Sequence, residues 1–588
     1  MQKSIVMLLL VMIWNLSSCT GQQDFTVTNP VSTLKIQPGA KKRGPVTDKV
    51  YIAMAKGEFE PAQVVISGSR KNLVNVRISA GPLMGPDGSI IPEERVTVNP
   101  VGFVNCDVST PGGRLKGKIP DVLLPNRAVD ISAGMSRPFF ITVQSTPGDL
   151  AGIYRGMIRI EADNASSRQL PLVVRVYDVT LPVRSRLRTA FVLWGNFENF
   201  LENTGPDAYI DTYIRYSKTL LAHRISPVTM WAPRKSGEGW DFSRIDRYLA
   251  ELVPLGLTTF NIGGDGIVAR THNTAFARAI SRHLKKAGWW HLHYVYGRDE
   301  APLGEVDEVK ADYLALVKAV PGIKIMQTGW APHPELKGLV KIWCPLTAIT
   351  DTENPEIRKK VMQMGPPPGA PPDLVPPIGD IEDMPDFGEQ EETIRGGLPS
   401  RFFPPPVEDF KVIKDAQAEG DEVWWYVCCT PHTPYANLFI DYPGIDHRIL
   451  GWMTYRYGIQ GFLYWGVDVW RDNKPPVEKY DKVNYENWDP TFKTFNGDGY
   501  LLYPGRNDTA VPSLRLALLR DGFEDYDLFT EVRSLAKGEG LLAKQARKLL
   551  TFKAPLIAGL PDYTQDGNLL LKRREAILRA GEKLNRKL

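Results

Sequence analysis

The chain has 588 residues, of which 43% are apolar, and its 71 basic and 67 acidic side chains nearly balance at a net charge of +4. This length exceeds what one compact core accommodates, so we expect two or three domains. A net charge this small does not create the basic field that nucleic-acid-binding proteins need, and we expect no nucleic-acid partner.

The N-terminus carries the pattern of an exported lipoprotein. Lys3 precedes an apolar run over residues 5–13, which is too short to span a bilayer but typical of a signal-peptide core. The tetrapeptide Leu16-Ser-Ser-Cys19 follows and resembles the bacterial lipobox. We therefore predict a signal peptide over residues 1–19, a lipid on Cys19, and a lipid-anchored protein of the bacterial cell envelope, periplasmic or surface-facing. The alternative is an ordinary signal peptide with an incidental cysteine.

The remaining cysteines and the histidines argue against a metal or disulfide framework. Cys106, Cys344, Cys428 and Cys429 lack the spacing of either kind of site. Histidine occurs only eight times, and no two residues have metal-ligand spacing on a predicted helix. We predict buried thiols, no catalytic metal and no cofactor.

Residues 25–182 are predicted to form an antiparallel β-sandwich. Short apolar runs, such as residues 62–66, 139–143 and 171–176, are separated by clusters of Gly, Pro and Asp. Short strands at this spacing, with little helical periodicity, are typical of a sandwich.

From residue 188 onward, apolar strands alternate with amphipathic helices, as in the helical pattern over residues 242–252 behind Asp241 as N-cap. Eight strands are predicted, over residues 188–194, 225–231, 257–263, 291–296, 323–328, 340–345, 423–429 and 461–467. Eight such units in order predict a (β/α)8 barrel, which we place at residues 188–588 together with C-terminal helices.

A segment rich in Pro, Gly and acidic residues, at about 366–406, interrupts this alternation between strands six and seven. A loop of this length in a compact domain usually has a function, and covering the mouth of the barrel is one. A surface excursion without such a role is the alternative.

The acidic pair Asp299-Glu300 stands apart from the other acidic pairs of the chain. Reacting groups in such barrels lie at the C-terminal ends of the strands. Glu93-Glu94 falls in the sandwich, Asp421-Glu422 precedes a strand, and Glu524-Asp525 falls in a helix, whereas Asp299-Glu300 immediately follows the fourth strand. This position favours a catalytic pair, with a solvated acidic loop as the alternative.

Adjacent carboxylates suit one mechanism of glycoside hydrolysis in particular. A conventional retaining pair stands on opposite sides of the scissile bond, whereas enzymes that use the substrate's own 2-acetamido group need no protein nucleophile. Asp299 would then orient the acetamido N–H, and Glu300 would act as general acid and base. Burial and the Asp299 charge are expected to raise the pKa of Glu300.

Aromatic, amide and acidic residues follow the other predicted strands. Flat rings stack on the C–H faces of sugars, and amides and carboxylates bond hydroxyl groups, although each aromatic alone is more often packing than ligand contact. The predicted sugar-binding residues are Trp194, Asn196, Trp231, Tyr296, Trp330, Tyr435, Asn437, Tyr464, Trp465, Asp468 and Trp470.

Three segments resemble glycoside hydrolase family 123, a family of β-N-acetylgalactosaminidases. They are residues 296–300, the run over residues 424–437 continuing to 461–465, and residues 499–505 with 520–526. The resemblance covers nearly the whole mature chain. It implies a β-sandwich before a catalytic barrel, retention of configuration through the acetamido group, and a catalytic pair at Asp299 and Glu300. The implied substrate is a glycan ending in β-linked N-acetylgalactosamine.

Two other functions remain open at this point. One is a retaining glycosidase of another sugar, with Glu300 as acid and Asp468 or another strand-end carboxylate as nucleophile. The other is a glycan-binding lipoprotein without catalysis, in which the strand-end aromatics hold sugar and the carboxylates only bond hydroxyl groups.

Overall fold

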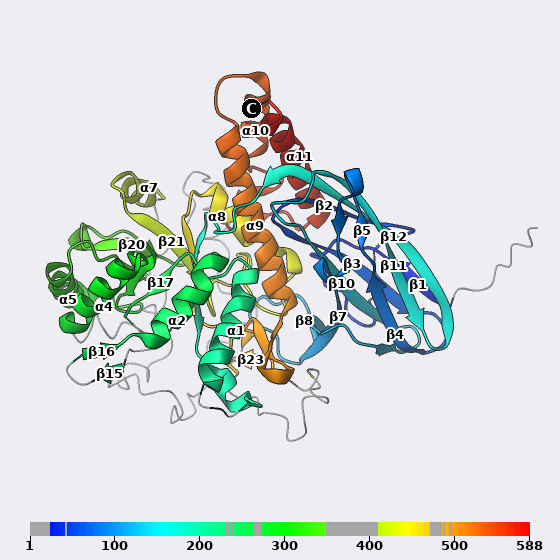
Figure 1. Ribbon diagram of the computed structural model, residues 1–588, viewed down its shortest axis with the longest axis horizontal. Helices are drawn as coiled ribbons and strands as arrows, with labels where there is room; N and C mark the ends of the chain where they lie inside the picture. The colour runs from blue at the N-terminus through cyan, green and yellow to red at the C-terminus, as the bar shows by residue number, and fades with distance from the viewer. Residues whose placement is uncertain are drawn as a thin grey trace, which may run out of the picture.

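A computed structural model describes residues 24–40, 44–203, 205, 207–229, 234–236, 239–263, 273–347, 410–470, 485, 488–492 and 495–587. Two bodies stand side by side, with the long helix α9 (Leu514–Leu535) between them (Figure 1). The predicted signal peptide, Cys19 and the 366–406 insertion lie outside the described residues. No helix within the described ranges is long and apolar enough to cross a membrane.

The N-terminal body is the predicted β-sandwich. One sheet has the order β1-β3-β10-β7-β8, and the other runs β2-β12-β11-β4-β9 with β5 and β6 attached to β11. All pairings are antiparallel except β2 with β12, which is parallel. Inward-facing Val, Ile, Leu and Phe side chains of both sheets form one core. The strands are β1 Phe25–Thr28, β2 Val50–Lys56, β3 Phe59–Gly68, β4 Leu73–Ala80, β5 Leu83–Met84, β6 Ile90–Ile91, β7 Val96–Cys106, β8 Gly117–Leu123, β9 Val129–Ile131, β10 Ser136–Gln144, β11 Gly152–Ala162 and β12 Ala165–Thr180.

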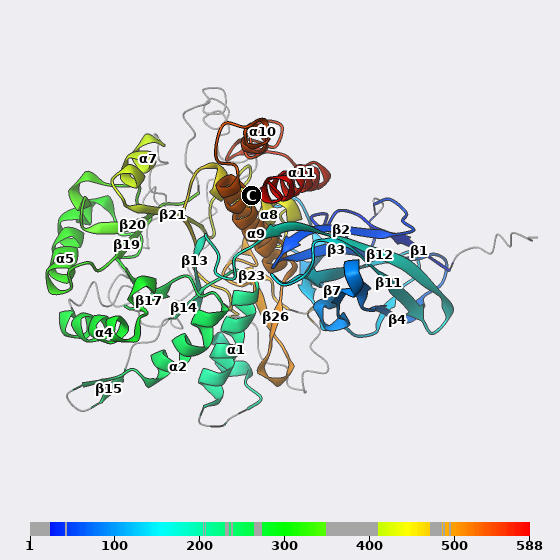
Figure 2. The ribbon, with the colours of Figure 1, turned by 45° about the horizontal axis from the view of Figure 1, so that its top comes forward.

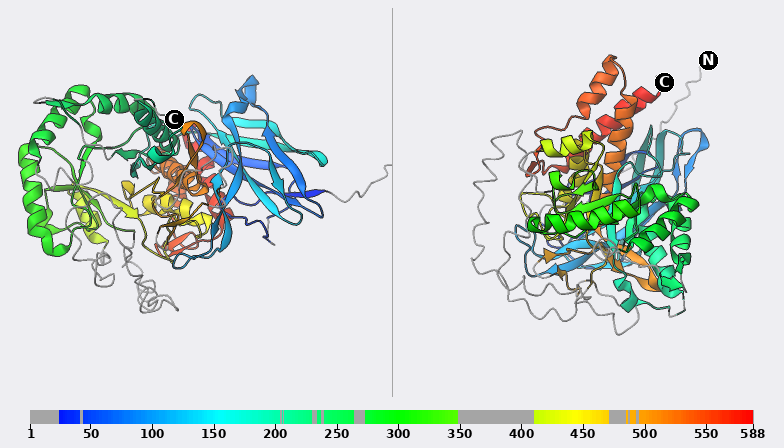
Figure 3. Two further views of the ribbon diagram at one scale, coloured as in Figure 1. Left: turned by 90° about the horizontal axis from the view of Figure 1, so that it is seen from below. Right: turned by 90° about the vertical axis from the view of Figure 1, so that its left-hand side faces the viewer.

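The second body is the predicted barrel. Its eight parallel strands follow the order β14-β13-β22-β21-β20-β19-β18-β17, and each of the eight predicted segments overlaps one of them. The strands are β13 Arg188–Leu193, β14 Pro227–Thr229, β17 Phe260–Asn261, β18 His293–Tyr296, β19 Ile325–Thr328, β20 Val340–Cys344, β21 Glu422–Val427 and β22 Gly461–Tyr464. The green helices form an outer arc around these strands (Figure 3).

Strand β17 is shorter than its predicted range because a side chain takes over the backbone pairing. The Asn261 side-chain oxygen accepts hydrogen bonds from the backbone N–H of Tyr296 and of Gly263, at 3.1 and 3.2 Å. It stands where a strand carbonyl would otherwise accept. The regular pairing of β17 with β18 therefore ends at Asn261.

The helices follow the barrel strands in alternation, then close the chain. Between β19 and β20 the structure has only a 3-10 turn (Pro334–Leu336), because few residues separate the two strands. The helices are α1 Ala208–Ala222, α2 Ser243–Leu252, α4 Thr274–Ala287, α5 Val306–Ala319, α7 Lys411–Ala418, α8 Gly444–Arg456, α9, α10 Leu541–Leu549 and α11 Gly567–Asn585. Short hairpins β15 Arg234–Ser236 with β16 Gly239–Asp241, β23 Thr491–Phe492 with β24 Phe495–Asn496, β25 Leu502–Pro504 with β26 Ala510–Pro512, and β27 Ile557–Gly559 with β28 Asp562–Tyr563 decorate the barrel.

The barrel interior is filled by every second residue of its strands. Ala190 and Val192 of β13, Tyr294 of β18, Met326 of β19 and Trp424 of β21 belong to one buried cluster. This alternation is the period of two that a strand imposes. Trp194, Tyr296 and Cys428 continue the same cluster as partly buried residues toward the strand C-termini, so they mark the mouth of the barrel.

A buried network of charges joins the two bodies. Arg448 of α8 donates to Glu60 of β3 at 3.0 Å and to Asp525 of α9 at 2.8 Å. Arg574 of α11 bonds the same Asp525 and also Glu58 of the sandwich. Helix α11 lies along β12 next to α9 (Figure 2), so the end of the chain holds the sandwich against the barrel.

Candidate active site

The Asp299-Glu300 pair leaves β18 at the barrel mouth, on a loop fixed from below. Arg298 turns away from the pair and donates to Asp312 at 2.7 Å and Glu305 at 3.1 Å. Gly297 has no space for a side chain, because a Cβ there would collide with the Tyr313 hydroxyl and a backbone carbonyl of β19. Close packing at Gly297 therefore restricts the backbone of the loop before the acidic pair.

Asp299 is exposed and held by two neutral donors. Its Oδ1 accepts from the Tyr296 hydroxyl at 2.7 Å and from the Thr328 hydroxyl at 3.0 Å. The Thr328 oxygen also accepts from the backbone N–H of Glu300 at 3.3 Å. Thr328, the last residue of β19, therefore orients both acids at once.

Glu300 adopts an unusual backbone conformation and is half-buried. Its φ is +42°, in the left-handed region that side-chain-bearing residues rarely occupy. The neighbouring Gly329 has φ +77°, and a Cβ there would lie 3.3 Å from Glu300 Cγ. The Tyr426 hydroxyl of β21 donates to Glu300 Oε1. The Glu300 carboxyl is therefore held across the barrel mouth from β18 to β21.

The surroundings of Glu300 favour its protonated form. Burial and the Asp299 charge raise the pKa of Glu300 to about 7, and the hydrogen bond from Tyr426 opposes that rise. Burial and the Glu300 charge hold the pKa of Tyr426 well above its usual range, so the phenol remains a donor. A carboxyl with a pKa near neutrality can give and take a proton at physiological pH.

Some of the predicted sugar-binding residues come together at the mouth. Trp194, Tyr296 and Trp465 are each half-buried. The Trp194 indole N–H donates to the Trp465 carbonyl at 2.9 Å, and the Trp465 indole N–H donates to Asp498 at 2.9 Å. Tyr296 also bonds Asp299, and Trp194 packs against the same buried cluster as Tyr296. Asn196 is half-buried beside them, and Trp231 lies outside the described residues.

Five of the predicted sugar-binding residues are buried, and internal hydrogen bonds occupy their side chains. The Asp468 carboxylate is fully buried and accepts from three successive backbone N–H groups, of Trp194, Gly195 and Asn196, each at 2.8 Å. Such a carboxylate fixes the loop after β13. The other four likewise bond protein groups: Trp330 the Ala301 carbonyl, Asn437 the Cys428 and Pro431 carbonyls, Tyr464 the Asp498 carboxylate, and Trp470 the Leu502 carbonyl.

Tyr435 has surroundings that differ from those of the residues at the mouth. It lines a small cavity with Trp425 and Leu450, and these two residues belong to the core that also contains residues of the surrounding helices. Trp425 and Tyr426 are consecutive residues of β21 and face opposite sides. Tyr435 therefore lies on the outer side of the strand whose inner side faces Glu300.

Sequence reasoning missed three residues that shape the site. Thr328 and Tyr426 bond the acidic pair, and Asp498 is almost fully buried and bonds Tyr464 at 3.1 Å as well as Trp465. Alternation along β19 and β21 carries the signal for the first two, since both are inward residues near the strand ends. Asp498 follows no barrel strand, so strand position gives no signal for it.

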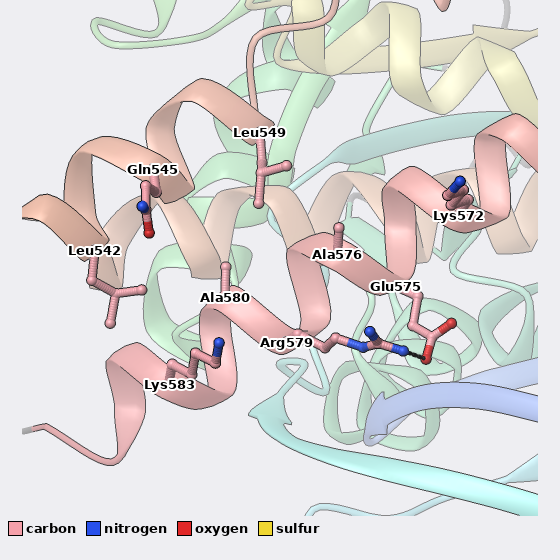
Figure 4. A pocket seen from close by; sticks show the side chains of 9 residues that line it. All are labelled: Leu542, Gln545, Leu549, Lys572, Glu575, Ala576, Arg579, Ala580 and Lys583. Carbon is pink, nitrogen blue, oxygen red and sulfur yellow. Dashed lines mark hydrogen bonds and ion pairs between the residues drawn. The ribbon is translucent and has the colours of Figure 1, made fainter.

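A separate groove of about 530 Å³ lies between α10 and α11 (Figure 4). Leu542, Leu549 and Lys572 line it, together with the ion pair between Glu575 and Arg579. None of the predicted site residues contributes to it, and both helices belong to the C-terminal closure of the chain. The chemistry points to the barrel mouth instead.

Within the described part of the chain, no group of three or more His, Cys, Asp or Glu side chains is placed to hold a metal ion. The arrangement at the mouth is instead a proton-transfer group of near-neutral pKa, a second carboxylate held by hydroxyl donors, and partly accessible aromatic rings. These are the elements that acid-catalysed cleavage of a glycosidic bond requires.

Comparison with known proteins defines the class. Residues 397–532 match the family described as glycoside hydrolase 123, catalytic domain. The segment includes β21, α8, β22 and most of α9. The chain is a glycoside hydrolase, with its catalytic part in the barrel.

The resemblance to glycoside hydrolase family 123 that the sequence motifs gave is confirmed by this match. A family 123 glycoside hydrolase from Clostridium perfringens, studied for glycolipid glycan hydrolysis, has the same fold, with a TM-score of 0.66, 14% identity, and coverage of 96% of this chain and 99% of that one. A family 39 glycoside hydrolase from Bacteroides cellulosilyticus reaches a TM-score of 0.31 at 11% identity, over 80% of this chain and 81% of that one. No curated protein matches the chain.

Proposed function

We propose that this glycoside hydrolase releases terminal β-linked N-acetylgalactosamine from glycans, with retention of configuration and with the substrate's own acetamido group as nucleophile. The observation that carries the proposal is the pairing of a half-buried Glu300 with an exposed, hydroxyl-held Asp299 on one loop at the barrel mouth. Two adjacent acids with such different surroundings suit two different tasks.

In the first step, the acetamido carbonyl oxygen attacks the anomeric carbon while the bond to the leaving oxygen breaks. Protonated Glu300 donates its proton to that oxygen, and its pKa of about 7 supports this role at neutral pH. Asp299 accepts the acetamido N–H and stabilises the positive charge that develops on the amide. The Tyr296 and Thr328 hydroxyl groups both donate to Asp299 Oδ1, and neither donates to Oδ2.

In the second step, ionised Glu300 takes a proton from a water molecule that attacks the anomeric carbon of the oxazolinium intermediate. The ring opens, the acetamido group is restored, and the sugar leaves with its original configuration. The Tyr426 hydroxyl stabilises the ionised form of Glu300 between the two steps through its hydrogen bond. Glu300 then carries the proton needed for the next cycle.

The sugar ring is held by the aromatic residues at the mouth. Trp194, Tyr296 and Trp465 are half-buried there. Because Tyr296 also bonds Asp299, contact of a sugar with this ring would be coupled to the position of the acid. The partner is thus a glycan whose terminal residue carries a 2-acetamido group.

The test is a panel of β-linked chromogenic glycosides, with the first-formed anomer of each product followed by NMR. We expect release of N-acetylgalactosamine as the β-anomer and inhibition by a thiazoline mimic of the intermediate. Release of the α-anomer first, or hydrolysis of sugars without an acetamido group at equal rates, would contradict the proposal.

A protein nucleophile is the competing mechanism, and Asp468 was its candidate. Three backbone N–H groups already bond that buried carboxylate, so it lacks a free face toward a sugar. A fluorosugar that trapped a covalent glycosyl-enzyme would decide for the competing mechanism. The alternative without catalysis is not retained, since the chain is a glycoside hydrolase.

We also propose that the enzyme is anchored to the bacterial cell envelope by a lipid on Cys19, as the residues around it indicate. Expression of the full chain with a radioactive fatty acid should label the protein, and Cys19→Ala should abolish the label and release the protein from the membrane fraction. Equal labelling of both forms would contradict the anchor.

A further inference from the structure

Two adjacent cysteines, Cys428 and Cys429, follow β21 at the barrel mouth. Their sulfur atoms lie 3.9 Å apart, and both residues are half-buried. Cys106 and Cys344 are fully buried. Reactivity of a thiol requires access as well as a thiolate, so the adjacent pair differs in kind from the two core cysteines.

The pair sits next to the groups that hold the catalytic acids. Cys428 packs against the buried cluster that contains Tyr426, and Trp194 and Tyr296 pack against the same cluster. Tyr296 bonds Asp299, and Tyr426 bonds Glu300. We therefore expect a change at the Cys428 side chain to disturb the packing around Tyr426, which bonds Glu300.

The backbone around the pair is fixed in a turn. The Cys428 N–H donates to the Thr430 carbonyl at 2.9 Å, and the Cys428 carbonyl accepts from the Asn437 side-chain amide at 2.9 Å. Because Asn437 is fully buried, the turn cannot move as a free loop. Both thiols are thus presented together on one rigid segment.

We propose that Cys428 and Cys429 form a dithiol site at the barrel mouth, which a trivalent arsenical bridges and a small-molecule disulfide closes to a ring, and that closure of this site slows glycoside hydrolysis. The activity part rests on the function proposed above. The binding part depends only on the two thiols.

Both reactions balance without a further reactant. An arsine oxide forms two As–S bonds, its arsenic stays trivalent, and its oxygen leaves as water with the two thiol protons. With oxidised glutathione, the Cys429 thiolate attacks one sulfur and one glutathione leaves. Cys428 then displaces the second, so that two electrons pass from the protein thiols to the reagent, which departs as two glutathione molecules.

The order of attack follows from the environment of the thiols. The hydrogen bond with Cys429, together with burial, raises the pKa of Cys428 well above its usual range, so Cys429 attacks first. Adjacent Cα atoms are about 3.8 Å apart, closer than the 4.4–6.8 Å typical of disulfides. A ring formed here is strained and easily reduced, which makes the modification reversible.

The arsenical test uses the full mature protein, phenylarsine oxide and intact mass spectrometry. The wild type should bind one arsenical per chain, resist removal by a monothiol and release it to 2,3-dimercaptopropanol. Cys428→Ser and Cys429→Ser should each fail to retain the reagent. Turnover of the wild type should fall by about tenfold or more and recover with the dithiol, whereas Cys429→Ser should keep its basal turnover and resist inhibition.

Oxidised glutathione provides a second measurement. The wild type should lose the mass of two hydrogen atoms, and each serine variant should instead gain one glutathione. Retention of the arsenical by the single variants, or no mass change in the wild type, would overturn the dithiol site. Full occupancy with unchanged turnover would overturn its coupling to hydrolysis. The mass measurements remain informative even if N-acetylgalactosamine is not the sugar released.

Discussion

Two acidic pairs of this chain, Asp299-Glu300 at the barrel mouth and Glu524-Asp525 in α9, differ in what surrounds them. Burial raises the pKa of Glu300 and of Glu524 alike, each to about 7. Glu524, however, faces arginines, including Arg224 at 3.3 Å, whereas hydroxyl groups hold the mouth pair. A raised pKa alone therefore does not distinguish a catalytic acid from a structural one.

The difference lies in how each charge is compensated. Asp525 shares Arg448 and Arg574 with the sandwich carboxylates, so its ionised form is paired inside the protein. Glu300 has Asp299 as its charged neighbour and Tyr426 as a neutral donor. A buried carboxyl beside a like charge can exchange its proton near neutral pH. A buried carboxyl that is paired with guanidinium groups has a structural role instead.

The largest effect should come from Glu300→Gln. We expect turnover to fall by about 10²–10⁴-fold, because the general acid is lost. The loss should be smaller on an aryl glycoside whose leaving group needs no protonation. Glu524→Gln is the matched control and should keep turnover per folded molecule. Equal turnover of Glu300→Gln and wild type would remove Glu300 from the mechanism.

The interface should respond in stability. Arg448→Met removes one of the two guanidinium groups that Glu60 and Asp525 share and leaves only Arg574. Breaking a buried pair of this kind costs about 3–5 kcal/mol. Chemical denaturation measures this loss. Arg579→Ala, at the exposed pair with Glu575, is the control and should cost under about 1 kcal/mol. Similar losses for the two variants would contradict the assigned role of the buried network.

A smaller effect concerns the pH profile of kcat/KM. Tyr426→Phe removes a donor that favours ionised Glu300, so the pKa of Glu300 should rise further above its usual range. Since the acid must be protonated, the alkaline limb should move to higher pH, by about one unit. A shift to lower pH would show that Tyr426 does not act on Glu300 in this way.

The smallest effect is on stability against pH. The pKa of Glu300 is raised in the folded state from 4.5 to about 7, so its protonated form favours folding below pH 4.5 and that contribution is lost as the pH rises to about 7. Glu300→Gln should therefore raise the stability at pH 8 by about 1–2 kcal/mol, and leave it unchanged at pH 4. Thermal unfolding at the two pH values measures this. A gain in stability of Glu300→Gln at pH 4 but not at pH 8 would contradict a raised pKa of Glu300.

The alternation of strands and helices predicted the fold, because each barrel unit repeats a pattern visible in the sequence. Strand-end position also singled out Asp299 and Glu300. It did not separate Glu300 from Asp468, since both are carboxylates after strands. That distinction depends on three backbone N–H groups of another loop, which bond Asp468. Likewise, Trp330 follows a strand but bonds the Ala301 carbonyl, a contact that no local pattern encodes.

The buried network of charges between the two bodies has a consequence for the order in which the chain folds. Glu58 and Glu60 emerge from the ribosome early, whereas their partners Arg448 and Arg574 emerge hundreds of residues later. N-terminal domains generally fold first. Before the barrel has formed, the sandwich must therefore keep these carboxylates solvated or protonated at an open face. That face can be sealed only once α11 is available, so docking of the last helix completes the assembly of the two bodies.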